Sequence, residues 1–300
     1  MGMIRGLISS PRESFMRKKH LSLLILVISS SFIVYFCSGG VALSQKPYRI
    51  LISNDDGISH PGTEALVAKL APLGEITVAA PSKNQSGVGH GSTFPGPIMV
   101  ESWERNGVKW YSIEALPATC VRLALLSLLS EKPDIVVAGI NKGANVGVIT
   151  FSSGTVACAR EAAYWDVPAL SVNMQSGKTM EYDAAADFVA ALVKEFKEKK
   201  LPPGTYLNIN IPNLPKNLIK GALVTRQDLR PPDERYEKRT SQEGETGYWS
   251  IYKVLENGDP KTDAWALSHD YISITPFQID QTQYSQIKKM KDWRVVNPRK

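Results

Sequence analysis

Two adjacent carboxylates, Asp55 and Asp56, follow directly after an apolar run in the stretch YRILISNDDGISHPG. Like charges placed side by side repel each other unless a cation or hydrogen-bond donors neutralise them. Divalent-cation binding through carboxylate oxygens is therefore one chemistry that the pair supports. The local alternative is a turn closed by Gly57, because Asn-Asp-Gly sequences form turns wherever they occur.

A second loop, APSKNQSGVGHGST at residues 80–93, is rich in glycine and small polar residues. Such a loop lets the backbone approach an anion and direct N–H groups at it. The hydroxyl of Ser86 could contact a cation, and His90 could donate a proton to a phosphate or a leaving group. The alternative for both residues is an ordinary place in a surface loop.

Two more loops carry amides and hydroxyls. In AGINKGANVG, Asn141 and Asn145 offer amide oxygens as neutral ligands, although asparagine also suits tight turns with positive φ. In TFSSGTVACAREAA, the residues Ser153, Gly154 and Thr155 stand where a helix should begin. The N–H groups and positive dipole end there suit phosphate, but Ser153 would also serve as a simple N-cap.

The elements that must position these loops alternate between short β-branched runs and amphipathic segments. Strands are expected at 48–53, 75–80, 133–140 and 168–174, and helices at 62–74, 117–129, 153–165 and 181–200. This alternation predicts parallel βαβ units, and strands that are apolar on both faces need helices on both sides. We expect an α/β fold with a Rossmann-like three-layer α/β/α core at about 46–215. The four loops would then meet at the carboxyl ends of the strands, the usual ligand-binding edge.

After residue 201 the pattern becomes β-rich, with strands expected at 205–212, 220–227, 248–256 and 270–277. The segment DLRPPDERYEKRTSQEGETG at 228–247 is polar and charged, and such a segment seldom packs within its own subunit. We interpret residues 216–300 as a C-terminal arm with an exposed hairpin that reaches a partner chain in a homo-oligomer.

The N-terminal 44 residues form a leader, with a basic stretch, an uncharged apolar run and small residues near Ser44. This layout predicts export to the periplasm or outside, by a signal peptide that is cleaved or by a retained membrane anchor facing outward. The leader holds five of the 35 basic and one of the 29 acidic residues. Residues 45–300 then have 30 basic and 28 acidic residues, a net charge of +2, which gives no case for a nucleic-acid surface.

Cysteine is scarce in the chain. Cys37 lies in the leader, and Cys120 and Cys158 each stand among small apolar residues. Buried thiols pack there as modest hydrophobes, with a disulfide between the two as the alternative in an oxidising compartment.

The constellation is more informative than any single loop. Three strand ends supply acids, a hydroxyl and amides, and a helix start supplies anion donors, which is the arrangement of a metal-dependent phosphohydrolase. Five blocks of this sequence, ILISNDDGISHPG, VAAPSKNQSGVGHGST, PDIVVAGINKGANVG, SSGTVACAREAA and TDAWALSHDYISITPF, resemble in order and spacing the motifs of the SurE survival-protein family. The resemblance runs from about Lys46 to Phe277.

The resemblance implies a 5′/3′-nucleotidase that depends on a divalent metal, Mg²⁺ or Mn²⁺, with one ion per subunit and nucleoside monophosphates as substrates. Some members also act on short polyphosphate. The family's subunits exchange a C-terminal arm in a homodimer or homotetramer. By motif, the metal ligands fall on Asp55, Asp56, Ser86 and Asn141. The phosphate contacts fall on Gly87, Asn145, Ser153, Gly154 and Thr155.

In the mechanism that we expect, Asp55 also orients the attacking water and His90 protonates the leaving oxygen. The chain departs from the family at Thr119, where an acid is frequent and the nucleoside is expected nearby, and in FSSGT, which replaces YSGT. An aspartyl-phosphate phosphatase is disfavoured because the two acids are neighbours. An exported protein that binds a nucleotide or phosphate without turnover remains an alternative. Base preference, the choice between 3′ and 5′ phosphate, the physiological metal and oligomer size stay open.

Overall fold

The computed structural model describes residues 46–242, 244–253, 257–293 and 295. The leader lies outside these residues, so export and membrane anchoring stay predictions. From Pro47 onward, the described residues form one compact unit. No helix in the described part of the chain is long and apolar enough to cross a membrane.

A nine-stranded sheet organises the described residues, in the order β3-β4-β2-β1-β5-β6-β7-β11-β8. The six central strands from β4 to β7 run parallel, while β3 and β11 run antiparallel to the neighbours β4 and β7. Its strands are β1 (Arg49–Ser53), β2 (Glu75–Pro81), β3 (Val100–Arg105), β4 (Val108–Ile113), β5 (Ile135–Lys142), β6 (Ala169–Met174), β7 (Thr205–Ile211), β8 (Gly221–Val224) and β11 (Tyr271–Gln278).

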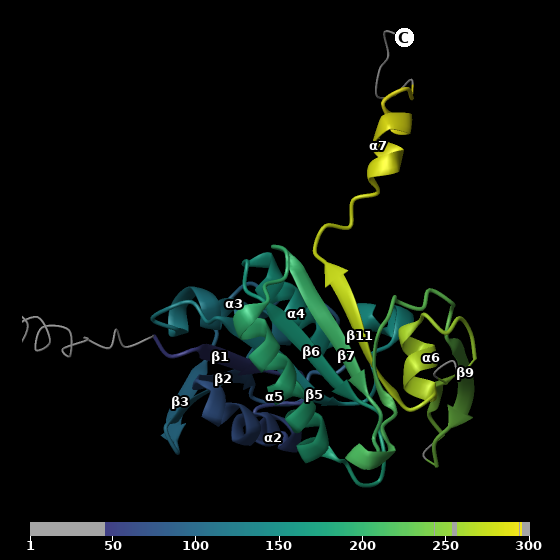
Figure 1. Cartoon of the computed structure of the whole chain (residues 1–300). Coiled ribbons are helices and arrows are strands. Elements are labelled where there is room, and N and C mark those ends of the chain that lie inside the picture. The colour runs from purple at the N-terminus through teal and green to yellow at the C-terminus, as the bar shows by residue number, and fades with distance from the viewer. Residues whose placement is uncertain (1–45, 243, 254–256, 294, 296–300) are drawn as a thin grey trace, which may run out of the picture. The chain divides into compact units, whose positions relative to one another are not determined.

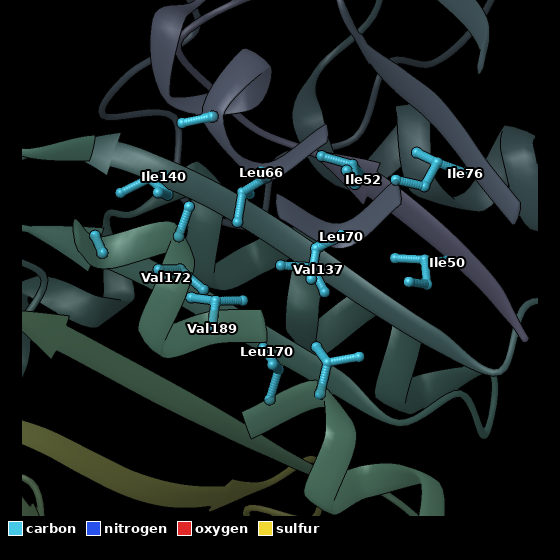
Figure 2. Packing of buried hydrophobic residues seen from close by; sticks show 14 of the residues in the cluster. Ile50, Ile52, Leu66, Leu70, Ile76, Val137, Ile140, Leu170, Val172 and Val189 are labelled. Atoms are coloured by element: carbon cyan, nitrogen blue, oxygen red, sulfur yellow. The ribbon is translucent and has the colours of Figure 1, made fainter. Parts of the chain in front are cut away.

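Helices cover both faces of the sheet, as the sequence predicts (Figure 1). On one face, α2 (Pro61–Leu70) and α5 (Tyr182–Glu198) pack against Ile50 and Ile52 of β1, and Figure 2 shows part of this cluster. On the other, α3 (Pro117–Leu123) and α4 (Gly154–Tyr164) share a second buried apolar cluster with Leu51 of the same strand. Successive strand residues point to opposite faces, so an uninterrupted apolar strand must be covered twice.

The Rossmann-like three-layer core is therefore confirmed, but the expected boundary near residue 215 needs correction. Strands β8 and β11 belong to the central sheet, with β11 inserted between β7 and β8. What extends from the sheet is the hairpin of β9 (Asp233–Thr240) and β10 (Thr246–Lys253), which pair with each other. Nearly all hairpin residues are exposed, whereas α6 (Asp263–Ser268) is largely buried and α7 (Tyr284–Met290) buries none.

The sequence interpretation missed strands β3 and β4, which form a hairpin at one edge of the sheet. Their turn uses Asn106 and Gly107, both with positive φ, which is typical of a tight hairpin. Strand β3 is almost entirely exposed, so it lacks the apolar pattern by which strands are recognised in sequence.

Candidate metal and phosphate site

The predicted loops meet at the carboxyl ends of β1, β2 and β5, beside the first turn of α4. A cavity of about 440 Å³ opens there. Six of the nine residues expected in the site line this cavity, and Ser152 lines it as well. The six are Asp55, Ser86, Gly87, Asn141, Asn145 and Ser153. Asp56, Gly154 and Thr155 are not among the lining residues.

The turn after β1 is built by Asn54. Its side-chain Oδ1 accepts a hydrogen bond from Gly57 N at 2.9 Å, and its Nδ2 donates to Gly57 O at 2.9 Å. Gly57 has a φ of 103°, a conformation that glycine adopts without strain. The prediction of a turn closed by Gly57 is therefore also correct. The side chain of Asn54 makes the hydrogen bonds of this turn, which leaves the two acids available for other contacts.

Asp55 is the most deeply placed acid of the site, with 3% of the residue exposed. Its carboxylate accepts a hydrogen bond from Thr155 Oγ1, and the Thr155 backbone also donates to it. Burial raises the pKa of the Asp55 carboxyl, the contacts from Thr155 oppose this, and the charge of Asp56 raises it further. The ionised form of Asp55 therefore calls for a cation close by.

Asp56 occupies a second environment at the same strand end. Its Oδ2 accepts a hydrogen bond from Lys142 N at 3.3 Å and lies 3.6 Å from Nδ1 of His60. Burial raises the pKa of Asp56 and lowers that of His60. Sequence reasoning missed His60, which is the N-cap of α2 and contacts Tyr182 OH through Nε2 at 3.3 Å. Its place in ISHPG, before a helix-starting proline, is a recognisable N-cap signal.

The two neutral ligand candidates reach the cavity from different elements. Asn141 donates from Nδ2 to Gly143 O at 2.8 Å, which leaves its Oδ1 to bind a ligand. Ser86 is exposed, and its backbone N–H donates to Asn84 Oδ1 at 3.0 Å. The neighbouring Gln85 N donates to Asp55 O at 2.7 Å, so this loop is tied directly to the first acid.

Asn145 is held by an asparagine network that the sequence did not reveal. Its Nδ2 donates to Asn173 Oδ1 at 2.6 Å, and its backbone N donates to Asn210 Oδ1 at 2.7 Å. Its carbonyl oxygen accepts from Asn208 Nδ2 at 2.7 Å. The partners lie on β6 and β7, strands that are neighbours only in the folded sheet. The network fixes the loop after β5 and leaves Asn145 Oδ1 as its free acceptor.

The start of α4 combines a cap with contacts to Asp55. Ser153 caps the helix by accepting from Val156 N at 3.1 Å. A side chain on Gly154 would lie 2.7 Å from Cβ and 2.8 Å from Oδ2 of Asp55, so glycine is required for this close approach. Thr155 is fully buried and its hydroxyl is used by Asp55. Thr155 therefore positions the carboxylate, and phosphate contacts would come from backbone N–H groups of this turn.

Two residues that the sequence placed near the substrate lie elsewhere. His90 lines a separate cavity of about 480 Å³, where its Nε2 lies 2.8 Å from Glu161 Oε2. This placement gives no support to His90 as the acid for the leaving group. Thr119 is buried in α3, where its Oγ1 accepts from Thr93 N at 2.9 Å, and it does not line the Asp55 cavity. Cys120 and Cys158 are buried free thiols, as the packing interpretation predicted.

The donor set suits a hard divalent cation. The carboxylate of Asp55, the amide of Asn141 and the hydroxyl of Ser86 line one cavity, and the carboxylate of Asp56 follows at the same strand end. Oxygen ligands of this kind favour Mg²⁺ or Mn²⁺. Elsewhere in the described residues, as here, no group of three or more His, Cys, Asp or Glu side chains gathers. A soft-metal site with several His or Cys ligands is therefore absent from that part of the chain.

The fold and the site together define a Rossmann-like α/β protein with oxygen ligands and anion donors at its strand ends, a class that includes metal-dependent phosphohydrolases. The sequence model of the family described as Survival protein SurE matches residues 50–234. The chain belongs to this family.

Named relatives and a solved structure agree with this assignment. A 5′-nucleotidase SurE of Syntrophobacter fumaroxidans is 41% identical over 249 residues, which cover 82% of this chain and 100% of the relative. A 5′-nucleotidase SurE of Methylobacillus flagellatus is 42% identical over 247 residues, covering 82% and 98%. The crystal structure of the SurE protein from Aquifex aeolicus matches with a TM-score of 0.73 and 36% identity, covering 81% of this chain and 98% of that one.

Proposed function

We propose that this protein is a divalent-metal-dependent phosphomonoester hydrolase that releases phosphate from nucleoside 5′- and 3′-monophosphates. The observation that carries the proposal is the buried Asp55 carboxylate, which shares one cavity with Ser86, Asn141 and Ser153, the N-cap of α4. Membership of the SurE family and the 5′-nucleotidase names of its relatives support the same reaction.

Asp55, Asp56, Ser86 and Asn141 would hold one Mg²⁺ or Mn²⁺ ion per subunit. Such an ion, when bound, polarises the phosphate and lowers the pKa of a water molecule. Asp55 accepts a hydrogen bond from a water and orients it for in-line attack, while Thr155 fixes the carboxylate. The backbone N–H groups of Gly87 and of the first turn of α4 stabilise the charge that develops on the phosphate oxygens.

The leaving oxygen needs a proton donor other than His90, which lies in a different cavity. His60 lies 3.6 Å from Asp56 Oδ2 but does not line the Asp55 cavity either. Burial lowers its pKa, which makes the ring a poor proton donor near pH 7. We therefore infer that His60 holds Asp56 in place and that solvent water protonates the leaving oxygen.

The wider biology follows from the same proposal. The chain works as a homodimer or homotetramer that uses the β9–β10 hairpin, on which Tyr236 and Tyr248 are about two-thirds exposed. Exposed aromatic side chains of this kind are typical of protein interfaces. The leader directs the protein out of the cytoplasm, and the protein would meet nucleoside monophosphates outside. We propose no nucleic-acid surface for it.

Phosphate release from a panel of 5′- and 3′-nucleoside monophosphates tests the proposal. The purified chain is assayed with Mn²⁺ or Mg²⁺ and then with excess chelator. Release that depends on the metal establishes the reaction and ranks bases and phosphate positions. Nucleotide binding without release under either cation would favour the binding-protein alternative instead.

A further inference from the structure

Glu161 is a buried charge outside the metal and phosphate site. The residue lies on α4 and is 2% exposed. Its carboxylate accepts hydrogen bonds from Arg122 Nε at 2.7 Å and from Trp165 Nε1 at 2.9 Å, and contacts His90 Nε2 at 2.8 Å. We call these four side chains the Glu161 cluster. Its contacts hold the pKa of Glu161 at about 2, well below the usual range, although burial acts against them.

His90 joins this cluster from the loop that also carries Ser86. This Ser86 loop comprises residues 82–99, between β2 and β3. Its polar tip is exposed at Ser86 and Gly87, and an exposed loop tip is mobile unless hydrogen bonds hold it. Near this tip, Gln85 N donates to Asp55 O at 2.7 Å, Gly89 N donates to Ser152 O at 2.9 Å, and His90 contacts Glu161. Further along the loop, Thr93 is held by hydrogen bonds to Thr119 and Leu116.

Helix α4 connects this restraint to the first acid. Its first turn contacts Asp55 through Thr155, and two turns later the same helix presents Glu161 to His90. A helix is stiff over this length, so anchoring the loop to Glu161 fixes Ser86 relative to Asp55. Arg122 of α3 balances the buried charge of Glu161 and keeps its carboxylate in place.

We propose that the Glu161 cluster is a positioning device for the Ser86 loop, in which His90 serves as a hydrogen-bond donor to Glu161 and does not protonate the leaving group. The inference rests on the proposed function to the extent that Ser86 and Asp55 bind the same ion. It explains why a histidine in a glycine-rich strand-end loop lines a cavity different from that of Asp55.

A matched pair of variants tests the inference in the full chain. In His90→Gln, the amide nitrogen can take the place of imidazole Nε2 and donate to Glu161. In His90→Asn, the amide is shorter by one carbon and cannot reach. Neither amide can act as an acid near pH 7. We expect His90→Gln to keep a near-wild-type Mn²⁺ affinity and near-wild-type hydrogen-exchange rates. We expect His90→Asn to weaken Mn²⁺ binding about tenfold, as is usual when the support of a metal ligand is lost.

Two readouts decide the outcome. Calorimetric titration with Mn²⁺ reports ligand positioning, and hydrogen exchange of residues 84–91 in the metal-free chain should be faster in His90→Asn than in His90→Gln. If both variants exchange and bind Mn²⁺ like the wild type, the positioning role is wrong. If both lose kcat equally while binding Mn²⁺ normally, His90 is the proton donor after all. A wild-type chain without phosphate release would refute the proposed function, whereas the exchange comparison would still test the cluster.

Discussion

Replacing Thr155 by valine should destabilise the metal-free protein by an amount that depends on pH. Thr155 is fully buried and its hydroxyl donates to the Asp55 carboxylate, which is itself 3% exposed. Valine has nearly the same shape but no hydroxyl, so the change leaves a carboxylate oxygen without that donor. A hydrogen bond to a charged group contributes about 1.5–3 kcal/mol, and we expect a loss of this size when Asp55 is ionised.

The sign of the pH dependence follows from the pKa of Asp55. Burial raises that pKa in the folded state, so the folded protein binds this proton more tightly than the unfolded chain does. The stability contribution of Asp55 is therefore lost as the pH rises through the folded-state pKa. The Thr155 hydroxyl limits this loss because it favours the ionised form. Thr155→Val should thus raise the pKa further and cost most at high pH.

Urea unfolding at about pH 5 and about pH 8, with chelator present, measures the effect as a difference in the free energy of unfolding. Thr155→Ser is the matched control, because it keeps the hydroxyl and loses a methyl group. We expect the gap between the valine and serine variants to widen at the higher pH. An equal gap at both pH values would show that the hydroxyl does not stabilise the ionised carboxylate, and the account of Asp55 would be wrong.

Three further predictions concern the site and the core. Asp55→Asn should abolish metal-dependent phosphate release while the circular dichroism spectrum stays native, and a variant with a near-wild-type rate would contradict the assignment. Gly154→Ala places a methyl group 2.7 Å from Asp55 Cβ, so kcat should fall about 100-fold in steady-state assays, and normal kcat would show that the helix start can move away at little cost. Burial raises the pKa of the Cys120 and Cys158 thiols, so a thiol reagent should react with two more cysteines after denaturation than before it. If denaturation without reductant exposes no additional reactive thiol, the two cysteines form a disulfide.

Several features of this protein could be predicted from sequence because they depend on local chemistry. The strands β1, β2, β5 and β6 are mostly apolar and carry buried residues on both faces, which requires helices on both sides of a parallel sheet. Because parallel strands end at one edge, the residues that follow them must meet there. The positions of Asp55, Ser86 and Asn141 around one cavity are a consequence of that rule.

Other features depended on contacts between residues far apart in the chain. The sequence could not show whether His90 faces the phosphate or Glu161, which lies 71 residues away, because a glycine-rich loop permits both. Nor could it show that the Thr155 hydroxyl is used by Asp55, or that β11 inserts between β7 and β8. Residue type and spacing along the chain determine which atoms can bind an ion. The direction in which each side chain points is decided by packing and by the requirement that buried polar groups find partners, and both arise only in the folded protein.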